Sequence, residues 1–269
     1  MLPRIRIGVS ACLLGAKVRF DGRDKRDAFL VDELGPLCEW VSVCPEVEVG
    51  MGVPREAVRL VADRDRGAGP RMLGVETGAD WTARMNRFAA SRVRALAREQ
   101  LSGFVLKSKS PSCGMERVKL FADVDARNPL RARSAGLFAA TLARAFPNLP
   151  IEDEERLQDR PLRESFIARV FAYARLRALF GGRWTLGALA AFHAAHETAL
   201  RAHSTDGARA LGRLVARGKS LGRAQLRARY EAGFMATLAR PATPGRQRHR
   251  AGLATTTRPS RLSVLQRPG

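Results

Sequence analysis

The sequence predicts an α/β protein with a mainly parallel, Rossmann-like sheet covered by helices on both faces, followed by a smaller all-α domain. Up to about residue 150, short apolar strand-like runs alternate with helix-like stretches, which is typical of parallel sheets. Beyond Pro150 the strand-like runs stop and the helical pattern continues. At 269 residues the chain exceeds the usual single domain, so a second unit is expected.

The elements of the first half follow from hydrophobic periodicity and from turn residues. Strands are predicted at 5–9, 41–43, 57–61, 103–106 and 118–122, and helices at 28–40, from 80 onward and at 135–146. The helix that begins at Asp80 has an apolar stripe formed by Met85, Ala89, Val93 and Leu96. Residues 44–54 and 63–70 are rich in glycine and proline, and we predict loops there.

The second half is predicted to contain four helices and an aperiodic end. The helices are expected at 161–180, 186–203, 207–217 and 223–239, with a hinge at Gly181-Gly182. These patterns divide the chain into an α/β domain at 1–160, a helical linker at 161–183, an all-α domain at 184–240 and a basic tail at 241–269. The tail lacks periodicity, and we expect it to be disordered.

The formal net charge is +21, which favours an anionic partner such as nucleic acid, because basic side chains displace counterions from phosphates. Biased codon usage in an Arg-, Ala- and Gly-rich chain is the competing explanation. No Asp or Glu follows Glu231, so the charge is uneven along the chain.

The chain contains no apolar run of about 18 residues and no leader-like segment at its start. We therefore expect a cytoplasmic protein with no membrane contact. Its four cysteines are too sparse for a disulfide scaffold, and in a reducing compartment they indicate metal ligands or reactive thiols.

Three of the cysteines follow apolar strands, namely Cys12, Cys44 and Cys113. In an open α/β sheet the carboxyl ends of the strands border one crevice, so these thiols are expected to converge. They are too widely spaced for a local zinc motif. Zinc, an iron-sulfur cluster and unrelated buried thiols all stay open on this evidence. The fourth, Cys38, lies in the predicted helix 28–40 and is assigned to core packing.

Polar residues beside these cysteines are candidates for site chemistry. Glu46, two residues beyond Cys44, has the position of a general acid or base, although a solvated loop carboxylate is the simpler alternative. Ser110 and Ser112 precede Cys113 and are candidates to bind cluster sulfurs or substrate. Arg55 and Lys107 are candidate anion contacts, against a background of abundant exposed cations.

Three histidines, His193, His196 and His203, lie on the predicted helix 186–203. No carboxylate or thiol completes a ligand set beside them, so packing or polar contacts are the favoured interpretation.

Three segments together resemble the thiouracil desulfidase family, in the family's order. They are Gly8-Val9-Ser10-Ala11-Cys12-Leu13-Leu14-Gly15, then Cys44-Pro45-Glu46 with Met51-Gly52-Val53-Pro54-Arg55, and Leu106-Lys107-Ser108-Lys109-Ser110-Pro111-Ser112-Cys113-Gly114. The resemblance covers residues 1 to about 160. It implies a 4Fe-4S cluster held by Cys12, Cys44 and Cys113, with Glu46 and Ser110 catalytic. Candidate substrate contacts are Ser10, Arg55, Lys107 and Ser112.

The second half resembles the helical domain of bifunctional family members that remove sulfur from 4-thiouridine in transfer RNA. The matching residues are Leu189-Ala190-Ala191-Phe192-His193, Ala202-His203-Ser204, Leu211-Gly212, Tyr230 and Phe234-Met235. That domain continues with further helices in the family, whereas this chain becomes aperiodic after Arg240. We therefore expect a partial accessory domain, truncated or shifted in reading frame.

The sequence thus predicts a 4Fe-4S-dependent, non-redox desulfidase. Its expected substrates are thiolated pyrimidines, 2-thiouracil or 4-thiouridine in transfer RNA, with oxo-pyrimidine and sulfide as products. A non-catalytic RNA-binding protein with structural cysteines is the alternative, and a cysteine-ligated zinc hydrolase is a third interpretation. The sequence gives no information on oligomeric state.

Overall fold

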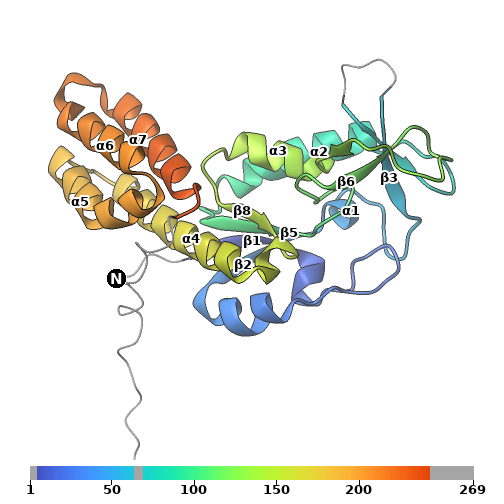
Figure 1. Cartoon of the computed structure of the whole chain (residues 1–269). Helices are drawn as coiled ribbons and strands as arrows, with labels where there is room; N and C mark the ends of the chain where they lie inside the picture. The colour runs from blue at the N-terminus through green and yellow to red at the C-terminus, as the bar shows by residue number, and fades with distance from the viewer. Residues whose placement is uncertain (1–4, 64–68, 243–269) are drawn as a thin grey trace, which may run out of the picture.

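The computed structural model describes residues 5–63 and 69–242. In Figure 1 the α/β unit occupies the middle of the molecule, and helices α5 (Leu186–His203), α6 (Thr205–Ala216) and α7 (Arg223–Leu238) gather at one end. Strands β3 and β6 lie toward the opposite end. The predicted fold class, an α/β domain followed by a smaller all-α domain, is confirmed.

A parallel sheet of four strands, in the order β2-β1-β5-β8, forms the centre of the described α/β unit. Its strands are β1 Arg6–Ser10, β2 Glu39–Val43, β5 Gly103–Leu106 and β8 Ile151–Asp153. Strands β1 and β5 are almost entirely buried, as expected when both faces of a sheet are covered. A Cβ atom on Gly8 would lie 2.1 Å from Cδ2 of Phe104, so the two strands pack closely only because residue 8 is glycine.

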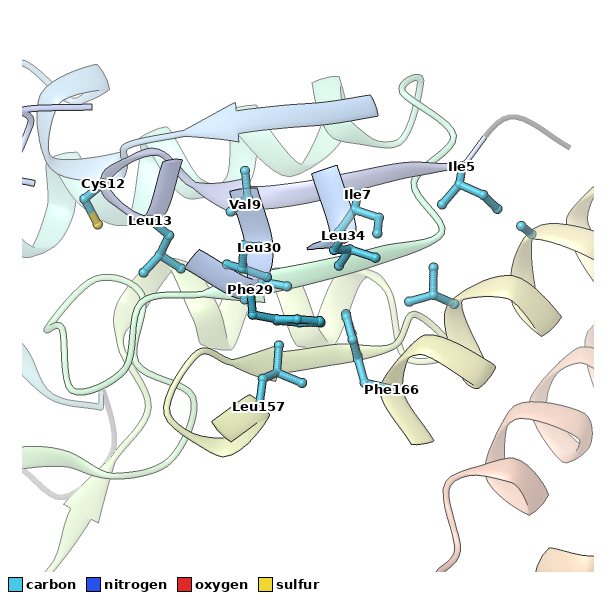
Figure 2. Packing of buried hydrophobic residues seen from close by; sticks show 13 residues of the cluster. Ile5, Ile7, Val9, Cys12, Leu13, Phe29, Leu30, Leu34, Leu157 and Phe166 are labelled. Carbon is cyan, nitrogen blue, oxygen red and sulfur yellow. The ribbon is translucent and has the colours of Figure 1, made fainter. Parts of the chain in front are cut away.

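Each face of this sheet has its own hydrophobic core. Figure 2 shows the first core, where β1 packs against Phe29–Leu34 and against the start of the long helix α4. Its members include Ile7, Val9, Leu13, Leu30, Phe166 and Val170, and Cys12 lies at its edge. The opposite face packs against helices α2 and α3 through Ala89, Val93, Phe104, Phe138 and Leu142.

A second, mixed sheet has the strand order β4-β3-β6-β7. Its strands are β3 Val58–Val61, β4 Arg71–Gly74, β6 Val118–Phe121 and β7 Arg133–Ser134. β3 pairs with β6 in parallel, while the β3–β4 and β6–β7 pairs are antiparallel. The predicted strands 57–61 and 118–122 therefore form, but in a sheet separate from the central one.

The described helices of the first half are mostly short. They are η1 Ala11–Leu14, η2 Phe29–Leu34, η3 Gly35–Leu37, α1 Pro45–Glu48, α2 Thr82–Leu96, α3 Leu137–Ala145 and η4 Arg156–Gln158. The buried residues of α2 are the four of the predicted stripe, Met85, Ala89, Val93 and Leu96.

The predicted helix 28–40 is wrong in its second half. A π-helical turn ends at Leu34, a short 3-10 turn follows, and Trp40 already lies in β2. Pro36 is the physical reason, because proline has no N–H to donate and disfavours helix in the residue before it. Cys38 consequently has extended backbone, and its half-buried side chain packs against the first core, in line with its assignment to packing.

The all-α part consists of α4 Arg160–Phe180, α5 Leu186–His203, α6 Thr205–Ala216, η5 Gly218–Ser220 and α7 Arg223–Leu238. Helix α4 belongs to two cores, because Phe166, Val170 and Ala174 pack on the central sheet. Residues on its other side pack with α5, α6 and α7, namely Ala172, Leu176 and Phe180. The predicted linker 161–183 is thus an ordered helix with two packed faces, and Gly181-Gly182 follow its last turn. The proposed domain boundaries stay predictions.

Two predictions on loops and disorder concern segments that the structure does not fully describe. Residues 64–68 of the expected loop 63–70 and residues 243–269 of the expected basic tail lie outside the described residues.

Candidate functional site

Three neighbouring strands of the central sheet, β2, β1 and β5, deliver one cysteine each to the same place. Cys12 lies in η1 directly after β1, Cys44 follows β2 and caps α1, and Cys113 lies in the loop after β5. Because these strands are adjacent and parallel, their carboxyl ends meet at one edge of the sheet. All three cysteines line a cavity of about 340 Å³, which we call the cysteine cavity.

Cys12 and Cys113 are buried, Cys44 is half-buried, and none of the three forms a disulfide. Burial, together with a smaller effect of the nearby Cys44, raises the pKa of Cys12 to about 11. Burial also raises the pKa of Cys44 and, well above its ordinary value, that of Cys113, where a hydrogen bond with the Ser10 hydroxyl acts in the opposite direction. Ligation of a metal centre must therefore displace protons from these thiols.

The donor set fits an iron-sulfur cluster. Cysteine thiolates are the usual ligands of such clusters, and three of them face one cavity here. Within residues 5–63 and 69–242, no three His, Cys, Asp or Glu side chains are close enough together to hold a single metal ion. A multinuclear cluster binds each cysteine through a different iron, so its ligands stand farther apart than those of one ion.

Glu46 lies at the wall of the cysteine cavity in the first turn of α1, with its carboxylate held on both oxygens. Arg55 binds Oε2, with Nη2 at 2.5 Å and Nε at 3.2 Å. Ser112 donates to Oε1 at 2.6 Å, and Ser110 donates to the same oxygen at 3.3 Å. The Glu46 and Arg55 side chains are only 14% and 6% exposed, so this ion pair is largely shielded from solvent.

The loop that carries Ser110 is held by hydrogen bonds within the loop and by its contact with the start of α3. The Ser110 hydroxyl accepts hydrogen bonds from the backbone N–H groups of Ser112 and Cys113, both at 3.2 Å. A Cβ on Gly136 would lie 2.4 Å from the Ser112 carbonyl oxygen, so the glycine before α3 lets that helix start against the loop. Ser110 lines the cysteine cavity beside Glu46 and Cys113, as the sequence predicted.

The predicted substrate contacts have different surroundings. Ser10 lines the cysteine cavity, and its Oγ accepts from Lys107 N at 2.9 Å. Ser112 is fully buried and is not part of the cavity lining; it holds Glu46 from behind. The Arg55 guanidinium also donates to the carbonyl oxygens of Val18 and Gly52, so its donors are engaged inside the protein.

Lys107 lines the cavity, but it pairs with a residue that sequence reasoning missed. Glu154 accepts from the Lys107 ammonium and from Ser108, through N and Oγ, both at 2.7 Å. Glu154 and the two acidic residues before it, Glu152 and Asp153, are all buried. The only local sign of this burial is strand β8 itself, a three-residue run of one apolar and two acidic residues, and such a short run is a weak signal.

Other lining residues that the sequence did not single out come from the loop after η1. They are Val18, Arg19, Phe20 and Lys25. The three histidines of α5 take no part in the site: His193 bonds the Tyr230 hydroxyl at 3.2 Å and His196 stacks on Phe192. His203 bonds the carbonyl oxygen of Arg240, just after α7, so each histidine makes a packing or polar contact.

A cavity lined by three thiols, with a shielded carboxylate and a serine at its wall, has the residue types from which cysteine-ligated metal centres are built. The chain belongs to the 2-thiouracil desulfurase family, whose model matches residues 7–154, more than half of the sequence. Residues 198–251 match a second model, a protein family of unknown function designated DUF1722.

Among solved structures, the chain is similar to the 4Fe-4S-dependent thiouracil desulfidase TudS. The two are 29% identical, and the alignment covers 60% of this chain and 99% of the other, with a TM-score of 0.47. No curated protein matches the sequence. No described helix is long and apolar enough to cross a membrane.

Proposed function

We propose that this protein is a 4Fe-4S-dependent desulfidase that replaces the sulfur of a thiolated pyrimidine with oxygen. The observation that carries the proposal is the cysteine cavity, in which three thiols share a wall with a carboxylate fixed by Arg55 and Ser112. Membership of the 2-thiouracil desulfurase family supports the substrate class. The reaction converts a thiocarbonyl and water into a carbonyl and hydrogen sulfide, with no net redox change.

In this proposal Cys12, Cys44 and Cys113 hold the cluster. When bound, it supplies an iron without a protein ligand, to which a thiocarbonyl sulfur can bind. Glu46 accepts a proton from the attacking water, because its carboxylate lines the cavity and is fixed in one orientation. Ser110, 3.3 Å from Glu46 Oε1, positions the substrate or passes the proton onward.

The substrate in this proposal is 2-thiouracil or 4-thiouridine within transfer RNA. A cavity of about 340 Å³ is at the small end for ligand sites, which suits one base and not a folded strand. A base within RNA must therefore leave its stack to reach the site. A groove between α6 and α7, lined by Arg213, Arg217, Arg229 and Arg240 and by no acidic residue among those described, suits RNA phosphates.

Anaerobic purification, cluster reconstitution and incubation with 2-thiouracil and thiolated transfer RNA test the proposal. We expect bound iron and acid-labile sulfide, release of sulfide and loss of the thione absorbance. Protein that holds neither iron nor sulfide after reconstitution would refute it. Salt-sensitive RNA binding without sulfide release would instead favour the second candidate, a non-catalytic RNA-binding protein, which the arginine-lined groove supports.

Replacement of Glu46 tests the proposed base. Glu46→Gln should lower kcat by about 100-fold or more, the usual contribution of a general base, while the iron content stays that of the wild type. Glu33→Gln, at an exposed carboxylate outside the cavity, is the matched control and should leave kcat unchanged. Equal rates for Glu46→Gln and the wild type would exclude Glu46 as the base.

A further inference from the structure

An exposed aromatic ring lines the cysteine cavity. Phe20 is the only aromatic residue among the described residues that line it. Its side chain is 42% exposed, and the other large hydrophobic residues found exposed in the described chain are aliphatic. The Arg19 guanidinium lies over one face of the ring, 5.7 Å from its centre. A large apolar ring exposed beside charged groups is typical of a ligand contact.

Backbone hydrogen bonds fix the turn that carries this ring. The Phe20 carbonyl oxygen accepts from Arg55 N at 3.0 Å, and the turn beyond it closes through Gly22 N to the Arg19 carbonyl oxygen at 2.9 Å. Gly22 has a φ of 71°, which favours glycine at this turn. The exposure of Phe20 is therefore a property of a fixed turn.

The same arginine connects Phe20 to the proposed chemistry. Arg55 binds the Phe20 carbonyl through its backbone N–H and the Glu46 carboxylate through its guanidinium. Its Nη1 also donates to the Val18 carbonyl at 3.1 Å, an oxygen that lies 3.8 Å from Cys44 Sγ. Arg55 thus links the backbone of Phe20, the Glu46 carboxylate and the Val18 carbonyl beside Cys44 around the cavity.

We propose that Phe20 is the surface on which the pyrimidine ring of the substrate stacks. The inference rests on the proposed function and adds a specificity-determining residue to it. Aromatic side chains stack on any nucleobase through its π-face, so Phe20 selects planar heteroaromatic thiones over aliphatic thioamides. For a base within RNA, the ring replaces part of the stacking lost when the base leaves its neighbours.

Two substitutions of Phe20 test the proposal on the reconstituted full chain, because they distinguish the effect of an aromatic ring from that of apolar volume. Phe20→Leu keeps apolar volume without the ring, and Phe20→Tyr keeps the ring. We expect Phe20→Leu to raise KM for 2-thiouracil by about 5- to 100-fold, the range of one lost base–aromatic stack, with kcat and iron content close to the wild type. Phe20→Tyr should keep the wild-type KM.

Leu37→Ala provides the control, since this 61% exposed side chain lies outside the cavity lining. An unchanged KM in Phe20→Leu, or an equal rise in Leu37→Ala, would overturn the proposal. Equilibrium dialysis of 2-thiouracil against the same proteins separates this failure from failure of the proposed function. If the wild type binds 2-thiouracil without turnover, the function fails, and weaker binding by Phe20→Leu still supports the stacking contact.

Discussion

At the scale of single residues, Arg55 carries the most connections in the site. Its guanidinium contacts the Glu46 carboxylate and two backbone carbonyls, and its side chain is almost completely buried. A buried ion pair gives little net stability, but removal of one partner leaves an uncompensated charge. The residue is therefore expected to be sensitive to substitution even in the protein without a cluster.

Arg55→Met should lower the free energy of unfolding by about 3 kcal/mol or more, because the Glu46 carboxylate then stays buried without its partner. Arg71→Met is the control: Arg71 pairs with Asp80 where both side chains are nearly half exposed, and because solvent screens such a pair its loss should cost much less. Urea unfolding of the apoprotein measures both values. If both variants lost the same free energy of unfolding, the Arg55–Glu46 pair would behave as a solvent-exposed ion pair, and the prediction would be wrong.

At the scale of elements, a carboxylate fastens the turn between β4 and α2 to the chain before β3. Glu56 accepts from the Thr77 hydroxyl at 2.6 Å, from Thr77 N at 3.0 Å and from Glu76 N at 2.9 Å. The Thr77 hydroxyl is the main cause that lowers the pKa of Glu56 from its ordinary value of 4.5. A depressed carboxyl pKa stabilises the fold above the unfolded-state pKa, and the contribution is lost as pH falls through the folded-state pKa.

Thr77→Val should therefore reduce the acid sensitivity of the fold. Between about pH 5 and pH 3 the midpoint temperature of the wild type should fall more steeply than that of Thr77→Val, which has less of this contribution to lose. Thermal unfolding over a pH series measures the difference. Thr141→Val, whose hydroxyl bonds a helix carbonyl, should keep the wild-type slope. Parallel curves for Thr77→Val and the wild type would contradict the assignment.

The same scale shows why some elements could be predicted and others could not. Strands β1, β2 and β5 can each be recognised locally as an apolar run followed by a cysteine. The convergence of Cys12, Cys44 and Cys113 then follows from the geometry of a parallel sheet. Strand β8 is short and ends in carboxylates. Glu152 pairs with Arg156, four residues further on, but also with the distant Arg169 at 2.9 Å, and Asp153 pairs with the distant Arg117. No local pattern shows the distant partners.

The candidate site divides in the same way. The positions of Cys12, Cys44, Cys113, Glu46 and Ser110 at one cavity agree with the sequence motifs. The place of Ser112 behind Glu46 depends on how the loop folds back over α3, and the pairing of Lys107 with Glu154 depends on the register of β5 and β8. Both require tertiary contacts that spacing along the chain does not encode.

At the scale of the whole molecule, α4 joins the α/β unit and the helical bundle. Phe166 and Val170 contribute to the first core, and Leu176 and Phe180 contribute to the core shared with α5, α6 and α7. One further contact crosses between the units: Glu231 of α7 accepts from Asn148 at 3.2 Å, and it also accepts from the Tyr173 hydroxyl of α4 at 3.2 Å. Unfolding of α4 thus removes part of each core.

We accordingly expect the two units to unfold in one transition. Trp40 lies beside the first core and Trp184 lies in the bundle core, so single-tryptophan variants report the units separately. Their urea midpoints should coincide with each other and with loss of helical circular dichroism, as two-state behaviour requires. Two separated midpoints would show that α4 holds its structure on one unit alone.

The hydrogen bonds of Arg55 also determine the breadth of the proposed active site. One side chain spans the distance between the segment after η1, through the Val18 carbonyl, and α1, through Glu46. The separation of those two walls is consequently fixed by the length of a single arginine. A shorter residue at position 55 could not contact both walls, and it is expected to alter which ring systems fit between them.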